Sequence, residues 1–264
     1  MPKSSRAKRQ TTHSNTYRFF VATPIEGSMV MIDDRQLAHQ LSNVLRLQPG
    51  DEIVLLDNSG EQYVVALQQL GRDHATGTVV RRAPASGEPQ THVTLYLGLM
   101  RPERFEWALQ KCTELGAAAF VPLVCERSAA ADMSERKAER WSRIVREAAE
   151  QSRRGRLPHI AAAQSFDHAC ATVDQYDLAL LLWEGAGVQS LRHALRAHTT
   201  PLNTIAVLSG PEGGLSDDEF KTASEHGIIP VTLGPRTLRA ETAPVAATTA
   251  ILYECGDMET TAQA

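Results

Sequence analysis

Short apolar runs separated by turn signals make up the first part of the chain. They predict strands at residues 19–21, 29–32, 53–56, 63–67 and 77–80. One helix interrupts these strands, with Asp33 or Asp34 placed to cap it. Its apolar residues recur at helical spacing, at Leu37, Leu41, Val44 and Leu45. A series of short strands with turns between them is typical of a compact barrel, so we predict a small β-barrel domain over residues 17–84.

The pattern changes after residues 83–89, which are rich in proline, glycine and small residues and predict a linker. Beyond them, apolar runs typical of strands alternate with longer stretches of helical periodicity. Strands are predicted at 93–97, 120–124, 178–183, 204–208 and 228–233. One long helix is predicted to begin near Pro102 and another near Ser134. This alternation predicts a mostly parallel α/β sheet in a second domain over residues 90–256.

The composition is that of an ordinary globular protein. Of the 264 residues, 42% are hydrophobic and 22% are charged, which is enough to form a large core without covalent staples. The four cysteines are scattered, at Cys112, Cys125, Cys170 and Cys255. Because they lack C-x-x-C pairing and zinc-ligand spacing, they predict reduced thiols and no metal site. No segment has the apolar length of a signal-peptide core or a membrane span, so we expect a cytoplasmic protein with no membrane partner.

Positive charge is concentrated locally, although the net charge is −4. Residues 1–18 contain no acidic residue and five basic ones, at Lys3, Arg6, Lys8, Arg9 and Arg18. A second basic stretch ends in Arg153, Arg154 and Arg156. A local positive face is sufficient for contacts with nucleic-acid phosphates. We interpret residues 1–16 as a basic flexible tail and the arginine cluster as a candidate phosphate contact, with a solvated helix face as the structural alternative.

Two glycine-bearing segments near the C-terminus carry the strongest functional signal. Their sequences are LSGPEGGL at 208–215 and LGPRTLRAETA at 233–243. Each follows a predicted strand and leads into a predicted helix, a context in which backbone N–H groups bind ligands. Neither segment has the Lys-Ser/Thr of a P-loop or the G-x-G-x-x-G of a dinucleotide site. The usual phosphate-binding interpretations are therefore excluded, and the absence of G-x-S-x-G argues against a hydrolase.

The side chains in these segments allow a functional and a structural interpretation. The first segment leaves its backbone open at Gly210, Gly213 and Gly214. Glu212 is either a ligand contact or a surface turn residue. The second segment places Arg236 and Arg239 close to Glu241. Arginine suits recognition of phosphate or carboxylate, whereas a salt-bridged helix N-terminus is the alternative.

Together, the two segments resemble the C-terminal half of the SPOUT-type RNA methyltransferases, and most of all the RsmE family of 16S rRNA uracil-N3 methyltransferases. The family begins with Arg-x-Phe and His-x-x-x-Val-Leu-Arg patterns, which are similar to residues 18–20 and 39–46. Its Lys-x-x-Glu-Leu-Gly pattern resembles residues 111–116, and its Glu-Ala-x-Glu-Gln-x-x-Arg pattern resembles residues 147–154. The chain departs from the family at Leu215, where an aromatic residue is frequent, and at Thr237, where an aliphatic residue is common. The resemblance covers residues from about 17 to 255.

The resemblance implies an α/β fold with a C-terminal SPOUT methyltransferase domain tied in a trefoil knot and an N-terminal PUA-like β-barrel that binds RNA. Propensity alone does not suggest a knot, since knotted chains are rare. The implied cofactor is S-adenosylmethionine, bound in a bent form at the knot. The implied cofactor-binding residues are Leu182, Trp183, Glu184, Leu208, Gly210, Glu212, Gly213, Gly214, Leu233, Gly234, Leu238, Arg239 and Ala240.

The implied reaction is methyl transfer to N3 of a uridine in 16S rRNA, within the 30S subunit. Because N3 must lose a proton, the site needs a group that stabilises negative charge on the uracil, and Arg239 is the candidate. Glu241 or Glu212 is the candidate base, unless either only orients Arg239. Arg18, Arg46, Arg153, Arg154 and Arg156 are the candidate RNA contacts. A homodimer is also implied; the alternatives are methylation at another RNA position or a non-catalytic RNA-binding assembly factor.

Overall fold

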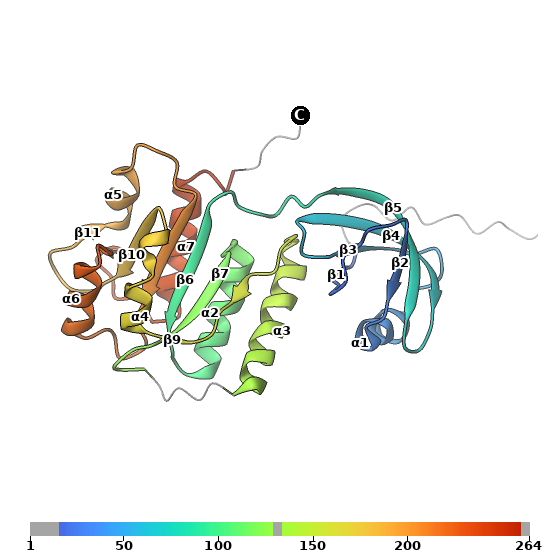
Figure 1. Cartoon of the computed structure of the whole chain (residues 1–264), viewed down its shortest axis with the longest axis horizontal. Helices are drawn as coiled ribbons and strands as arrows, with labels where there is room; N and C mark the ends of the chain where they lie inside the picture. The colour runs from blue at the N-terminus through green and yellow to red at the C-terminus, as the bar shows by residue number, and fades with distance from the viewer. Residues whose placement is uncertain (1–15, 129–133, 260–264) are drawn as a thin grey trace, which may run out of the picture. The chain divides into compact units, whose positions relative to one another are not determined.

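The computed structural model describes residues 16–128 and 134–259 and divides into two compact units, Met1–Ala85 and Ser86–Ala264 (Figure 1). The predicted basic tail lies outside the described residues, apart from residue 16. The two units are described separately below.

The N-terminal unit is a curled five-stranded sheet with a short helical segment (Figure 1). Its elements are β1 (Arg18–Phe20), β2 (Met29–Ile32), α1 (Arg35–His39), the π-helical turn η1 (Gln40–Val44), β3 (Glu52–Leu56), β4 (Glu61–Leu70) and β5 (Ala75–Pro84). The strand order is β1-β3-β4-β5-β2. β1 pairs with β3 in parallel, and the other neighbours are antiparallel. The five predicted strands are confirmed, because alternate residues such as Ile53 and Leu55 enter one hydrophobic core.

The helical segment begins as predicted and ends differently. Asp34 caps α1, since its Oδ1 accepts hydrogen bonds from the N–H groups of Gln36 (2.8 Å) and Leu37 (3.1 Å). Leu37 and Leu41 enter the core as expected. The prediction that Val44 shares their face is wrong, because Val44 is 65% exposed. The π-helical turn is wider than an α-helical turn and rotates Val44 away from the core face.

The C-terminal unit is a parallel α/β domain. Its strands are β6 (His92–Gly98), β7 (Ala119–Val124), β8 (His159–Ile160), β9 (Gln164–Ser165), β10 (Leu178–Leu182), β11 (Gln189–Ser190), β12 (Thr204–Ser209) and β13 (Ile229–Thr232). Its helices are α2 (Pro102–Leu115), α3 (Glu135–Gln151), α4 (Phe166–Cys170), η2 (Val173–Gln175), α5 (Leu191–Arg196), α6 (Asp217–Glu225) and α7 (Thr242–Glu254). The strand order is β11-β13-β10-β12-β6-β7-β8, with β9 beside β7, and all pairs are parallel. The predicted parallel sheet is confirmed.

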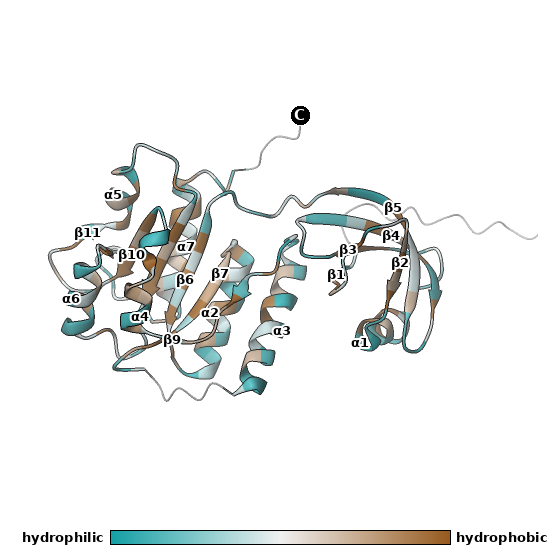
Figure 2. Ribbon diagram, in the orientation of Figure 1, coloured by the Kyte–Doolittle hydropathy of each residue, from teal (hydrophilic) through white to brown (hydrophobic). Residues whose placement is uncertain are grey.

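Helices cover both faces of this sheet, so it forms the middle of three layers (Figures 1 and 2). On β6, Leu95 and Leu97 pack with residues of α2, α3, α5 and α7, whereas Tyr96 packs with residues of α4 and α6. The strands are therefore apolar on both faces, as parallel sheets require. Helix α2 begins with Pro102 and ends at Gly116, which has a φ of 115° and satisfies the last helical carbonyl groups.

Strand register determines where a ligand site can form. Leu181 of β10 lies opposite Leu208 of β12, and Leu182 lies opposite Val231 of β13. The carboxyl ends of these three strands therefore lie side by side, and the loops that follow them meet at one edge. Among the described residues, no helix has both the length and the apolar character to cross a bilayer.

Candidate functional site

A cavity of about 900 Å³ opens where the loops after β10, β12 and β13 meet. Its lining includes most positions predicted to bind a cofactor, namely Leu182, Trp183, Glu184, Gly210, Glu212, Gly213, Gly214, Leu233, Gly234, Leu238, Arg239 and Ala240. Leu208 is the exception. It is 0% exposed and belongs to the hydrophobic core beneath the sheet edge, so its predicted cofactor contact is corrected. A cavity of this size accommodates a ligand as large as a nucleoside derivative.

The first glycine segment is held close against β6. A side chain at Gly98, the last residue of β6, would place its Cβ 2.4 Å from the nitrogen of Pro211. Gly214 has a φ of 70°, a conformation that other residues adopt at a cost. Nη1 of Arg127 donates to the carbonyl oxygens of Gly213 and Leu215, at 3.3 Å each. The backbone itself, fixed from both sides, forms this wall of the cavity.

Helix α6 begins directly after this segment, as predicted, and it begins with a capping box. Ser216 accepts a hydrogen bond from the N–H of Glu219, and Glu219 accepts one from the N–H of Ser216. The other carboxylate oxygen of Glu219 accepts from the N–H of Glu126, at 2.9 Å. One buried carboxylate thus connects the helix start to the turn that carries Arg127.

The second glycine segment forms the opposite wall. Gly234 has a φ of 111°, and its N–H donates to the hydroxyl of Thr232 at 3.2 Å. The carbonyl oxygen of Arg239 accepts from the N–H groups of Thr242 (2.8 Å) and Ala243 (3.0 Å), which starts α7. Glu241 occupies the N-cap position of α7 without a side-chain capping bond.

The loop after β10 completes the cavity with an aromatic side chain. The ring of Trp183 lies 4.6 Å from the ring of Phe220 on α6, measured between centroids. Trp183 also lies against Gly185, where a Cβ would be 2.1 Å from its Nε1 atom. The N–H of Trp183 donates to the carbonyl of Val231, at 3.0 Å. These contacts fix an apolar surface in the lining.

Two arginines in the lining were not predicted from the sequence. Arg104 comes from the first turn of α2 and Arg127 from the turn after β7. Nη1 of Arg104 lies 3.6 Å from Oε1 of Glu212 and 3.8 Å from Oε2 of Glu241. Neither arginine is part of a local motif, because each acts on residues that only the sheet topology brings near.

The predicted catalytic residues take different positions. Arg239 and Glu212 belong to the lining, and Arg239 is exposed. Glu241 is not part of the lining, and its side chain is 13% exposed. The structure therefore brings all three to one region, with Arg239 accessible to a second ligand and Glu241 beneath the surface.

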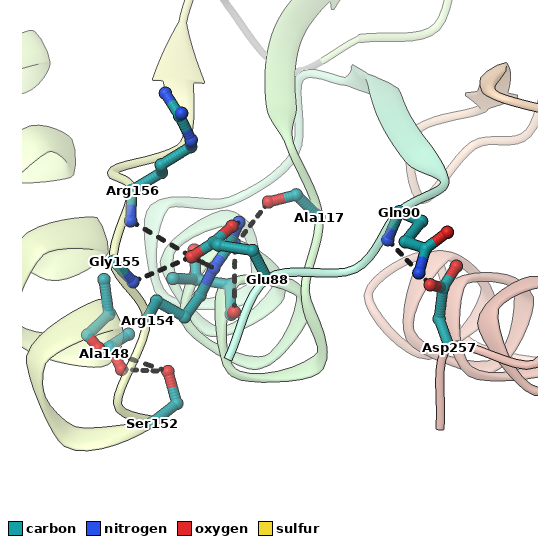
Figure 3. A network of polar contacts seen from close by, with 11 residues as sticks. Glu88, Gln90, Ala117, Ala148, Ser152, Arg154, Gly155, Arg156 and Asp257 are labelled. Carbon is teal, nitrogen blue, oxygen red and sulfur yellow. Dashed lines mark hydrogen bonds and ion pairs between the residues drawn. The ribbon is translucent and has the colours of Figure 1, made fainter. Parts of the chain in front are cut away.

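The predicted RNA contact at Arg154 is wrong. Arg154 is 3% exposed, and its guanidinium forms an ion pair with Glu88, in which Nη2 lies 2.8 Å from Oε2 (Figure 3). Its Nη1 donates to the carbonyl groups of Thr113 and Ala117. Because the guanidinium is buried and four of its five N–H donors bond inside the domain, this arginine cannot reach a phosphate.

The other predicted RNA contacts lie nearer the surface. Arg153 and Arg156, which flank the buried pair, are exposed, and Arg153 has a φ of 65°. In the N-terminal unit Arg46 is exposed, whereas Arg18 is half-buried and donates to Oε1 of Gln62 at 2.9 Å. Two adjacent arginines thus differ in exposure, because Arg153 lies at the surface and Arg154 lies in the core.

Two family models match the chain and define its class. The model described as an RNA methyltransferase domain matches residues 87–252, and the one described as an RNA methyltransferase PUA domain matches residues 32–80. A parallel α/β domain with a cavity at its strand ends, preceded by a small β-rich domain, agrees with both. The protein is thus of the RNA methyltransferase class.

Curated relatives narrow the class to one family. The chain is 39% identical over 242 residues to ribosomal RNA small subunit methyltransferase E of Synechocystis sp., covering 91% of this chain and 78% of that protein. It is 33% identical over 222 residues to the protein of the same name from Bacillus subtilis, covering 82% and 87%. The chain belongs to the ribosomal RNA small subunit methyltransferase E family, RsmE.

A solved structure supports the same assignment. The protein of this name from Neisseria gonorrhoeae, crystallised bound to S-adenosyl methionine, is similar with a TM-score of 0.83 and 29% identity over 91% of this chain and 98% of that one. The predicted family is confirmed, and so is the predicted α/β fold, which has an RNA methyltransferase domain and an N-terminal PUA-like domain. The trefoil knot stays a prediction.

Proposed function

We propose that this protein transfers a methyl group from S-adenosylmethionine to N3 of a uridine in 16S rRNA of the small ribosomal subunit. The observation that carries this proposal is the cavity formed by three glycine-bearing strand-end loops, in a chain of the RsmE family. The relative from Neisseria gonorrhoeae was crystallised with S-adenosyl methionine, which supports the same cofactor here. The protein acts in the cytoplasm, where ribosomal subunits are assembled.

The residues of the cavity fit this cofactor. S-adenosylmethionine carries no phosphate, and the lining has neither phosphate-loop signature. Gly210, Gly213 and Gly214 leave backbone groups accessible for an amino acid and a ribose. Leu182, Trp183 and Leu238 supply the apolar surface that an adenine ring requires. When bound, the cofactor supplies an electrophilic methyl group on a positively charged sulfur.

The side chains of this protein then favour attack by N3. Arg239 is exposed in the lining and stabilises negative charge on the uracil as the N3 proton leaves. The proton is accepted by Glu241 or Glu212, unless these carboxylates act only by orienting arginines. Since N3 lies on the Watson–Crick edge, the uridine has to be unpaired or extruded before it enters the cavity.

RNA is held mainly through its phosphates. The PUA-like unit offers Arg46 and Arg18, and the methyltransferase unit offers Arg153 and Arg156. Such contacts position the RNA without reading its sequence. A positive local surface on a chain of net charge −4 is compatible with this role.

A homodimer is the proposed assembly. Helix α7 has no charged residue before Glu254, yet Tyr253 on it is 72% exposed. Helix α2, which packs on α7, exposes Trp107. A helix that is apolar all round is normally buried on every side, so a second copy of this chain is the fitting cover.

Nucleoside analysis tests the proposal. Mass spectrometry of 16S rRNA from a strain without this gene should show the loss of 3-methyluridine, and the purified protein with S-adenosylmethionine should restore it. Persistence of 3-methyluridine together with the loss of a 2′-O-methylated nucleoside or another methylated base would assign a different target. Calorimetry with S-adenosylmethionine separates both outcomes from a non-catalytic RNA-binding factor, which would not bind the cofactor.

A further inference from the structure

Arg104 contacts both walls of the cavity. It lies in the first turn of α2, and its side chain is 34% exposed. From this position Nη1 lies 3.6 Å from Oε1 of Glu212 in the first glycine segment and 3.8 Å from Oε2 of Glu241 in the second. One guanidinium group is therefore shared between carboxylates that belong to two separate loops.

Glu212 is anchored at the start of α2. Its Oε1 and Oε2 accept from the N–H of Arg101, the N-cap residue, at 3.3 and 3.4 Å. A carboxylate at a helix N-terminus is stabilised by unpaired N–H groups and by the helix dipole. The side chain of Arg101 adds little, since it is 75% exposed and its Nε lies 4.0 Å from Oε1. Glu212 thus ties the first segment to α2.

Glu241 depends on Arg104 for a counter-charge. Its Oε2 atom is buried and has no hydrogen-bond partner among the described residues. Among the described residues, the cation that lies within 4.0 Å of this oxygen is the guanidinium of Arg104. A carboxylate that is only 13% exposed is costly to leave without a counter-charge. The ion pair with Arg104 therefore stabilises the charged form of Glu241 strongly, even at a distance of 3.8 Å.

We infer that Arg104 is a positioning residue that holds the two glycine segments in the arrangement that binds the cofactor. Without it, Glu212 and Glu241 would face each other across the cavity edge with no cation between them, and the segments that carry them would separate. On this assignment Glu212 is an anchor of the first segment and not the base. The inference rests on the proposed function for the identity of the cofactor.

Calorimetry of the full-length protein with S-adenosylmethionine tests the inference. Arg104→Met should weaken cofactor binding about tenfold or more, since coupled contacts contribute on this scale. Arg104→Lys keeps the charge, so its cofactor affinity should lie between those of Arg104→Met and the wild type. Arg101→Ala is the matched control and should bind like the wild type, because its hydrogen bonds to Glu212 come from the backbone. At saturating cofactor, kcat of Arg104→Lys should stay within about threefold of wild type while KM for the cofactor rises.

A charge-removing second substitution distinguishes positioning from general destabilisation. Arg104→Met combined with Glu241→Gln should regain most of the lost cofactor affinity, because the carboxylate that Arg104 neutralises is gone. Equal cofactor affinity of Arg104→Met and the wild type would overturn the inference. So would a loss of affinity in Arg104→Lys as large as that in Arg104→Met, or a double variant that binds the cofactor no better than Arg104→Met alone. Failure of the wild type itself to bind the cofactor would instead overturn the proposed function.

Discussion

The guanidinium of Arg154 and the carboxylate of Glu88 form a two-point ion pair inside the methyltransferase unit. Nε lies 3.2 Å from Oε1, and Nη2 lies 2.8 Å from Oε2 (Figure 3). Oε1 of Glu88 also accepts from the N–H groups of Gly155 and Arg156. The pair fixes the turn after α3 against the first residues of the unit, and it explains why a cluster of arginines contains one that is structural.

Arg154→Ala should destabilise the protein without a direct effect on RNA contacts. The substitution leaves Glu88 without its counter-charge and the carbonyl groups of Thr113 and Ala117 without this donor, which costs about 3 kcal/mol for a buried pair. Chemical denaturation followed by circular dichroism measures this loss. A change below about 0.5 kcal/mol would contradict the structural role.

Arg153→Ala and Arg156→Ala should weaken RNA binding and leave the stability of the protein nearly unchanged. Both side chains are exposed, so stability should change little, while RNA binding weakens at low salt. The slope of log affinity against log salt should fall by about 0.7 for each phosphate contact removed from single-stranded RNA. Filter binding across a salt series measures the slope, and an unchanged slope would show that these arginines do not contact phosphate.

Arg239→Ala should lower turnover strongly and leave the fold intact, because the side chain is exposed. A donor that stabilises the charge developing on the uracil is expected to contribute about a hundredfold to kcat. Transfer of labelled methyl groups to 16S rRNA under saturating conditions gives kcat, and calorimetry gives cofactor affinity. Turnover near the wild-type rate would remove Arg239 from its proposed role.

Gly98→Ala should damage the cofactor site from within the sheet. The added Cβ would lie 2.4 Å from the nitrogen of Pro211 and 2.7 Å from the carbonyl carbon of Gly210, so the first glycine segment has to shift. We expect weaker cofactor binding and a loss of about 1–3 kcal/mol in stability. Gly27→Ala is a control in the other unit, because the nearest atom to its Cβ would be 3.9 Å away.

Thiol alkylation should be slow and should begin at Cys255. Burial raises the pKa of Cys112, Cys125 and Cys170 to about 12, so these thiols stay protonated and unreactive from pH 7 to 9. Burial also raises the pKa of Cys255, with the nearby Asp257 and Glu254 adding to the shift, but this residue is exposed. Mass spectrometry after iodoacetamide treatment at pH 8 should find Cys255 modified first, at a rate that increases with pH. Early modification of Cys112 would contradict the packing of α2.

Features encoded by neighbouring residues were predictable from the sequence. Short apolar runs placed the five strands of the first unit and five of the eight described strands of the second, and Ser216 with Glu219 marked the start of α6, since both signals depend on residues a few positions apart. The glycines also marked the walls of the cavity, at Gly210 and Gly213 among others. A backbone that comes close to a ligand requires residues without a side chain. Family resemblance then supplied the cofactor, the substrate and the order of domains.

Tertiary structure alone decided which charges face inward. Arg153 and Arg154 are adjacent and chemically identical, yet Arg153 is exposed whereas Arg154 is buried and paired with Glu88, 66 positions away in sequence. The position of Arg104 between Glu212 and Glu241 likewise depends on strand order, which brings α2 beside two loops from the far end of the chain. Electrostatic pairing depends on distance in space, so a sequence shows which charges exist and only the fold determines which of them meet.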